Sequence, residues 1–203
     1  GEPGGWGGIY FNEGSDHEGI ESELEYCVIS NGGHNTWGGT GNLITFNTVE
    51  PSIAFTNLTR SSSYPVRLMG LSHPNFRQNV QFTDNVEDAI AVNAADYRDD
   101  ILWNANGLPY HVLGVINVWD NSDQLPPRLT IAAGNLVKFD DAAGILIGQN
   151  GSNRHGELFA VGTQEDPIVF TSISGETAGW RGLYFADHSD YGDAQSVLRN
   201  SLI

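Results

Sequence analysis

The chain of 203 residues is 39% hydrophobic and carries 25 acidic against 9 basic side chains, a net charge of −16. Such a surface repels phosphate backbones and anionic lipid, which argues against nucleic acid as a partner, and it attracts cations such as calcium. No apolar run reaches the length of a membrane span, and the one cysteine, Cys27, allows no disulfide framework.

The first and last segments of the chain are related to each other. Residues 1–29 align with residues 175–203 without a gap, and 12 of the 29 pairs are identical, whereas unrelated sequences would share about two or three. We call these two segments the terminal repeat. Cys27 aligns with Ser201, which indicates a small turn position rather than a reactive thiol. Internal repeats are typical of proteins built from stacked units.

Short β-rich runs follow one another along the whole chain, separated by Gly, Asn, Asp and Ser. The best helical candidate, 84–97, has Ala-Ile-Ala-Val at its centre, which fits a helix poorly. We therefore expect an all-β fold with strands at 8–11, 26–29, 43–46, 52–55, 66–69, 80–82, 89–92, 111–118, 129–131, 136–139, 144–148, 157–162, 167–172, 182–185 and 196–198.

Two all-β architectures accommodate these strands, a sandwich or barrel and a solenoid. A sandwich seldom uses so many very short strands, and it does not repeat its first segment at its end. In a parallel β-helix each coil contributes about three short strands, and each strand pairs with its equivalent one coil away. We therefore predict a single parallel β-helix domain over residues 1–203, with roughly 22–25 residues per coil and roughly seven to eight coils.

The segment 129–185 also carries a recognisable motif. Its runs LTIAAGNLVKF, GILIG, GELFAVGTQEDPIVFTS and GWRGLYF, together with residues 6–29, resemble the right-handed parallel β-helix repeats of large secreted and cell-surface bacterial proteins. The resemblance implies that fold and an extracellular location, but no activity, because the fold carries enzymes, adhesins and inert spacers alike. The matched motif places four side chains in the core: Phe139, Ile147, Phe170 and Phe185.

Two acidic segments could carry catalysis, and each has a plainer interpretation. Paired aspartates serve as acid and base, or as calcium ligands, in polysaccharide-cleaving β-helices, but Asp140–Asp141 follows a strand at a coil corner, where solvated carboxylates are favoured. Arg98 stands among Asp96, Asp99 and Asp100, as the base of a lyase stands beside calcium-binding carboxylates. Ion pairing within a polar loop is the favoured interpretation there.

Two further features could bind ligands. The loops 13–19 and 187–193 recur in the terminal repeat, and turns rich in carboxylate oxygens suit calcium, although plain acidic loops are favoured. The candidate calcium ligands are Glu13, Asp16, Asp187 and Asp190. Three tryptophans without counterparts in the terminal repeat would form a platform for glycan rings if they are exposed together. They are Trp37, Trp103 and Trp119.

We interpret the chain as a structural solenoid of a secreted or cell-surface protein: a spacer, a stalk or a self-assembling fibre unit. An adhesin that recognises a protein or glycan partner is an intermediate interpretation. We expect no enzymatic activity; the alternative is a carbohydrate-binding or polysaccharide-cleaving β-helix with a glycan partner. Neither end carries a recognisable cap. We therefore expect other copies stacked head to tail, or neighbouring repeats of a longer chain, to cover at least one end.

Overall fold

The computed structural model describes residues 1–16, 20–35, 38–47, 49–104, 106–121, 125–150, 154–175, 179–190 and 195–203. These residues form strands, turns and loops; among them there is no helix, and so none that is long and apolar enough to cross a membrane. The chain divides into two compact units, where the sequence predicts one domain: unit 1 (Gly1–Val92) and unit 2 (Asn93–Ile203). Each unit is described by itself.

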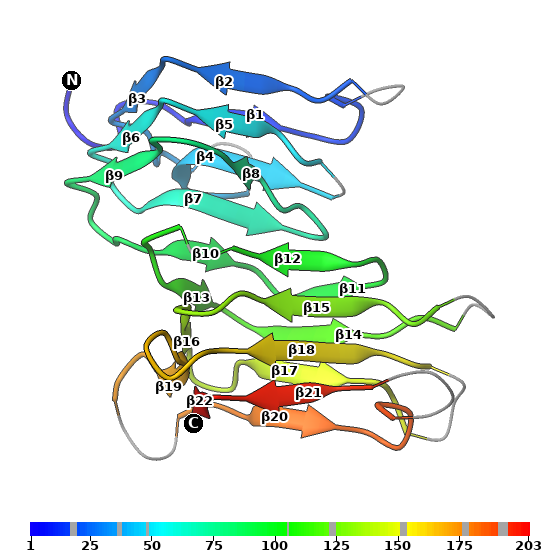
Figure 1. Cartoon of the computed structure of the whole chain (residues 1–203). Helices are drawn as coiled ribbons and strands as arrows, with labels where there is room; N and C mark the ends of the chain where they lie inside the picture. The colour runs from blue at the N-terminus through cyan, green and yellow to red at the C-terminus, as the bar shows by residue number, and fades with distance from the viewer. Residues whose placement is uncertain are drawn as a thin grey trace. The chain divides into compact units, whose positions relative to one another are not determined.

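The described part of unit 1 forms three sheets of parallel strands, in the orders β1-β4-β7-β10, β2-β5-β8 and β3-β6-β9. Every third strand therefore returns to the same sheet, and successive coils lie one above the other within the unit (Figure 1). The strands are β1 (Ile9–Phe11), β2 (Glu23–Glu25), β3 (Val28–Ser30), β4 (Gly41–Phe46), β5 (Ser52–Ala54), β6 (Asn57–Thr59), β7 (Tyr64–Met69), β8 (Asn75–Phe76), β9 (Gln81–Thr83) and β10 (Ile90–Val92).

Unit 2 has the same organisation, with parallel strands in the orders β11-β14-β17-β20, β12-β15-β18-β21 and β13-β16-β19-β22. Its strands are β11 (Ala95–Tyr97), β12 (Ile101–Trp103), β13 (Tyr110–Val112), β14 (Val115–Val118), β15 (Arg128–Ile131), β16 (Leu136–Phe139), β17 (Gly144–Ile147), β18 (Glu157–Val161), β19 (Ile168–Ser172), β20 (Gly182–Phe185), β21 (Val197–Arg199) and β22 (Ser201–Leu202).

Both units are parallel β-helices, which confirms the fold class predicted from the sequence. Inward-pointing side chains of neighbouring coils lie in register: Leu129 pairs with Leu158, and Ile116 pairs with Ile145, each at most 1% exposed. Burying one such side chain stabilises the fold by about 1.5–3 kcal/mol. A single coil cannot bury its own inner face, so this stabilisation requires that coils stack.

The coils differ in length because their loops differ. Leu43 pairs with Val66, which lies 23 residues further along the chain (66 − 43) and within the predicted coil length. Ile145 pairs with Leu183, 38 residues further along (183 − 145), because longer loops join the strands between them. The predicted coil length is therefore wrong for this part of unit 2, and a fixed period does not locate equivalent residues.

Each predicted strand overlaps a strand of the structure, but the sequence pattern misses some of the shortest strands. β2 and β6 each hold a single apolar residue, Leu24 or Leu58, between polar neighbours, so their alternation is too short to be recognised in the sequence. The run 111–118, predicted as one strand, forms β13 and β14, because the chain turns between them.

Three of the four predicted core side chains are buried. Phe139 and Ile147 are 0% exposed and Phe170 is 2% exposed, and the Phe139 ring stacks on Phe170 and Trp180 at centroid distances of 6.4 and 4.3 Å. The prediction for Phe185 is wrong, because this side chain is 42% exposed. Phe185 is in register with Ile147, but β20 is the last strand of its sheet, and no described coil covers its other side.

The described parts of the two halves of the terminal repeat share several local contacts. β1, β2 and β3 of unit 1 correspond to β20, β21 and β22 of unit 2. In the first coil the Ser22 hydroxyl donates a hydrogen bond to the Ser15 carbonyl oxygen at 3.0 Å, and in the last coil Ser196 donates to Ser189 at 3.3 Å. The described serines at the two ends of each loop therefore make the same contact in both halves of the repeat.

The corner after these loops is also repeated. Tyr26 and Asn200, which align with each other, both have left-handed backbone conformations, with φ of 54° and 48°. The next residue, Cys27 or Ser201, donates a hydrogen bond to the carbonyl oxygen two residues earlier, at 3.2 and 3.3 Å. Cys27 thus occupies a turn position in which its sulfur takes the place of a hydroxyl.

Candidate functional site

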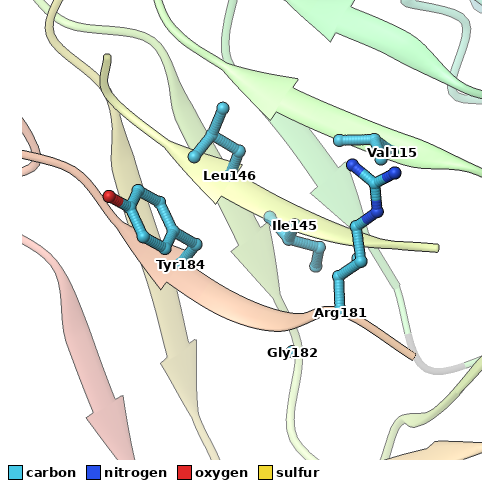
Figure 2. A pocket seen from close by; sticks show the side chains of 7 residues that line it. Val115, Ile145, Leu146, Arg181, Gly182 and Tyr184 are labelled. Carbon is cyan, nitrogen blue, oxygen red and sulfur yellow. The ribbon is translucent and has the colours of Figure 1, made fainter. Parts of the chain in front are cut away.

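A shallow hollow of about 270 Å³ lies on the outer face of the sheet that contains β14, β17 and β20 in unit 2 (Figure 2). Val115, Gly144 and Gly182 are in register across these three strands and run along its floor. Two of these residues lack a side chain, so backbone forms most of the floor. The neighbouring register column, Leu146 and Tyr184, forms one wall.

The fold requires glycine at both floor positions. A Cβ atom on Gly144 would lie 2.8 Å from the carbonyl oxygen of Gly182 and 3.0 Å from the Cβ atom of Arg181. Gly182 has φ of 84°, in the region that residues with a side chain rarely adopt, and its counterpart in the terminal repeat, Gly8, has φ of 95°. The floor is therefore flat because the close strand contact at Gly144 and the left-handed backbone at Gly182 both require a residue without a side chain.

Tyr184 and Arg181 supply the groups that a ligand could contact. Figure 2 shows Tyr184 with Leu146 on one side of the hollow, and the Arg181 guanidinium beside Val115 on the other. Tyr184 is 52% exposed, and its hydroxyl accepts a hydrogen bond from the Asn150 amide at 3.0 Å. Within the described part of the chain, Arg181 has no acidic partner. A flat, partly apolar ligand with hydroxyl or carboxylate groups suits this combination.

The adjacent aspartates Asp140 and Asp141 have different surroundings. Nε2 of His111 donates a hydrogen bond to Oδ1 of Asp140 at 2.7 Å, and the His111 side chain is only 7% exposed. Asp141 is exposed. The interpretation as solvated corner carboxylates therefore fits Asp141, whereas Asp140 also anchors a buried histidine that the sequence analysis missed. The only sequence signal is the spacing of 29 residues (140 − 111), the same as between Leu129 and Leu158 on neighbouring coils.

Arg98 is engaged by nearby side chains. Its guanidinium lies 3.5 Å from a carboxylate oxygen of Asp96 and 4.5 Å from the centre of the Trp119 ring. The Arg154 guanidinium lies over the same ring at 3.9 Å. Asp96 also accepts a hydrogen bond from Asn117 at 2.8 Å. The favoured interpretation, an arginine paired within a polar loop, agrees with these contacts.

The two described candidates for a glycan platform, Trp103 and Trp119, do not meet its condition of shared exposure. Trp103 is 0% exposed and Trp119 is 8% exposed, so neither presents a free ring face. Trp103 stacks on Tyr110 at 4.9 Å and meets Tyr97 edge-on at 6.4 Å, as a core residue does. Trp37 lies outside the described residues.

The best-defined of the predicted calcium ligands, Asp16, already accepts two backbone hydrogen bonds, from the N–H groups of Ser22 at 2.8 Å and Glu50 at 2.9 Å. Burial raises the pKa of the Asp16 carboxyl, but these donors outweigh burial, and the net pKa lies below its ordinary value. In unit 1 Glu13 accepts a hydrogen bond from Asn47 at 3.2 Å. The other two candidates, Asp187 and Asp190, are exposed in unit 2.

Among the described residues, no group of three or more His, Cys, Asp or Glu side chains is placed to hold a metal ion. Calcium binding stays a prediction. It is tested by comparing the melting temperature in millimolar calcium and in chelator, because a ligand that binds only the folded state raises stability.

Comparison of the chain with protein-family models, with curated proteins and with solved structures returned no match. The family resemblance seen in the sequence therefore stays a prediction, and function has to be inferred from the geometry of the two units.

Proposed function

We propose that this chain is a structural, non-catalytic solenoid segment of a secreted or cell-surface protein, and that further parallel coils cover its first coil (β1–β3) and its last coil (β20–β22). The observation that supports this proposal is the exposure of inward-pointing apolar side chains on both of these coils. The extracellular location is supported only by the sequence resemblance.

In the last coil, inward-pointing side chains are exposed although their register partners one coil earlier are buried. Phe185 is 42% exposed while Ile147 is 0% exposed, and Leu198 is 39% exposed while Ala160 is 0% exposed. Apolar surface in water costs about 25 cal/mol per Å² relative to burial. A further coil would remove this surface from water.

The first coil of unit 1 has the same property. Ile9 and Leu24 are half-buried, while their register partners Leu43 and Ile53 are 0% exposed. Among the described strands, each strand of these two coils pairs on one side only. The other side presents unpaired backbone N–H and C=O groups, which favour the addition of another strand.

Light scattering on the purified chain over a range of concentrations tests this proposal. The average mass is expected to rise with concentration, because the end coils of separate copies cover each other. Phe185→Glu introduces a charge on the inner face of the last coil and should suppress the rise. Val86→Glu is the matched control, since Val86 is a 67% exposed apolar residue outside both end coils. A chain that stays monomeric at every concentration contradicts the proposal.

A second candidate function, carbohydrate binding, is favoured by the hollow between Tyr184 and Arg181. Its glycine floor and tyrosine ring suit the apolar face of a sugar, and the guanidinium suits hydroxyl or carboxylate groups. A glycan-binding screen followed by titration tests it. Tyr184→Ala should abolish any binding found in the hollow, whereas Phe159→Ala, which removes a 36% exposed ring outside it, should leave binding unchanged. Equal binding by both variants excludes the hollow as the site.

A further inference from the structure

Coils that pack against each other in unit 1 have matching corners. Tyr26 lies at the corner between β2 and β3 with φ of 54°, and Phe55 lies at the corresponding corner between β5 and β6 with φ of 48°. The two rings stack with centroids 4.8 Å apart and planes 5° apart, and the N–H of Asn57 donates to the carbonyl oxygen of Cys27 at 2.9 Å. Equal backbone conformation at the corner thus accompanies stacking in register.

The last coil of unit 2 has the corner that would continue such a stack. Asn200 lies between β21 and β22 in the same left-handed conformation as its counterpart Tyr26, and the preceding loops share their serine hydrogen bonds. We infer that a second copy of this chain docks its first coil on this last coil in the register of the terminal repeat, so that β1, β2 and β3 of the second copy pair with β20, β21 and β22. This inference rests on the proposed structural function and names its partner.

The register brings apolar side chains of similar size together on the inner face. Phe185 meets Phe11 of the second copy, and Leu198 meets Leu24 of the second copy. Phe11 points inward, because its register column runs through Thr45 to the buried Leu68, whereas the neighbouring column runs through the partly exposed Arg67. Leu24 points inward too, since it lies between the exposed Glu23 and Glu25 and is in register with Ile53, which is 0% exposed. The inner columns of the two copies would therefore continue through the contact.

The outer face is complementary in charge at one position and opposed at another. Arg199 is exposed, has no acidic partner within the described residues, and would face Glu25 of the second copy, which in its own unit lies 3.2 Å from Arg77. Opposite charges across a strand pair are stabilising. Asp190 would face Asp16 of the second copy, which is unfavourable; added salt screens this repulsion and the Arg199–Glu25 attraction alike.

The same register extends the hollow of Figure 2. Gly8 of the second copy would follow Gly182 on the floor, and Tyr10 of the second copy would follow Tyr184 on the wall. Gly8 has the left-handed φ of Gly182, and Tyr10 is placed on the outer face of β1, in register with Ile44.

Disulfide formation tests the register, because Ser201 would lie opposite Cys27 of the second copy. Neighbouring strands are about 4.8 Å apart, within the range of about 4.4–6.8 Å between the Cα atoms of a disulfide. Oxidised Ser201→Cys should form a ladder of covalent multimers on a non-reducing gel, since each copy then has one cysteine at each end. The wild type, with Cys27 alone, can form nothing larger than a covalent dimer.

Leu202→Cys is the matched control, because its side chain points to the opposite face of the same strand. It should form no ladder. The register is wrong if Leu202→Cys forms the ladder and Ser201→Cys does not. It is also wrong if neither variant forms the ladder while light scattering still shows assembly. In both cases the proposed structural function stands. If every variant and the wild type stay monomeric, both are overturned.

Discussion

Replacing Phe139 by alanine should lower the free energy of unfolding by about 3–5 kcal/mol. The side chain is 0% exposed, and its ring lies 4.3 Å from that of Trp180 and 6.4 Å from that of Phe170. Returning a fully buried phenylalanine to water accounts for about 1.5–3 kcal/mol, and each lost aromatic contact adds about 0.5–1.5 kcal/mol. Together these terms give about 2.5–6 kcal/mol, a span centred on the range expected for this substitution.

Phe185→Ala is the control, because it removes the same atoms from an inward-pointing ring that is 42% exposed and covered on one side only. With little more than half of the side chain buried, we expect a loss of about 1–2 kcal/mol. Urea denaturation followed by circular dichroism and tryptophan fluorescence measures both values by linear extrapolation. Equal losses in the two variants, or a loss below about 1 kcal/mol for Phe139→Ala, would refute the stacked-coil description of the core.

Three further variants test separate parts of the structure. Asp16→Asn should be less stable than the wild type at pH 7, because the pKa of Asp16 is lowered on folding. The difference in stability should be fully present above the ordinary aspartate pKa of about 3.9 and should vanish as the pH falls through the folded pKa. Denaturation measured as a function of pH tests this. A difference that persists at pH 2 would show that the charge is not its cause. Gly144→Ala places a methyl group 2.8 Å from a backbone oxygen and should lower the free energy of unfolding, measured by heat or urea, by about 1–3 kcal/mol. An unchanged free energy of unfolding would contradict the close contact between these strands. Asp140→Ala removes the carboxylate that the buried His111 contacts and should lower stability by about 1–2 kcal/mol. Replacing the exposed neighbour, Asp141→Ala, should change stability by less than about 0.5 kcal/mol. Equal effects of the two substitutions would show that the His111 contact does not stabilise the fold.

The fold class follows from the sequence because strand-forming runs alternate with turn residues throughout, and because the terminal repeat favours a stack over a sandwich. Which side chains point inward follows from the resemblance for Phe139 and Phe170, because the matched motif places both in the core. Whether an inward side chain is buried depends instead on a coil at each side. Phe185 has the right motif position and the right direction, and it is exposed because it lies on the last coil.

The candidate sites were harder to predict because they join residues from different coils. The contact between His111 and Asp140 and the hollow between Tyr184 and Arg181 depend on register along the stack, which changes with every loop. Because the loops differ in length, the sequence has no fixed period from which the register between coils can be calculated. The burial of Trp103 and Trp119 has a similar cause, since a tryptophan without a repeat partner can still be covered by an arginine or tyrosine of a neighbouring segment.

The central claim is that the first and last coils are two different, complementary surfaces, and sedimentation velocity on a mixture of two variants tests it most directly. Phe11→Glu blocks the first coil and Phe185→Glu blocks the last, so each variant alone should be monomeric. Mixed in equal amounts, they should form complexes of two copies and nothing larger, because only one pair of unblocked coils remains. A mixture that contains only monomers, or a single variant that still assembles, would contradict the claim.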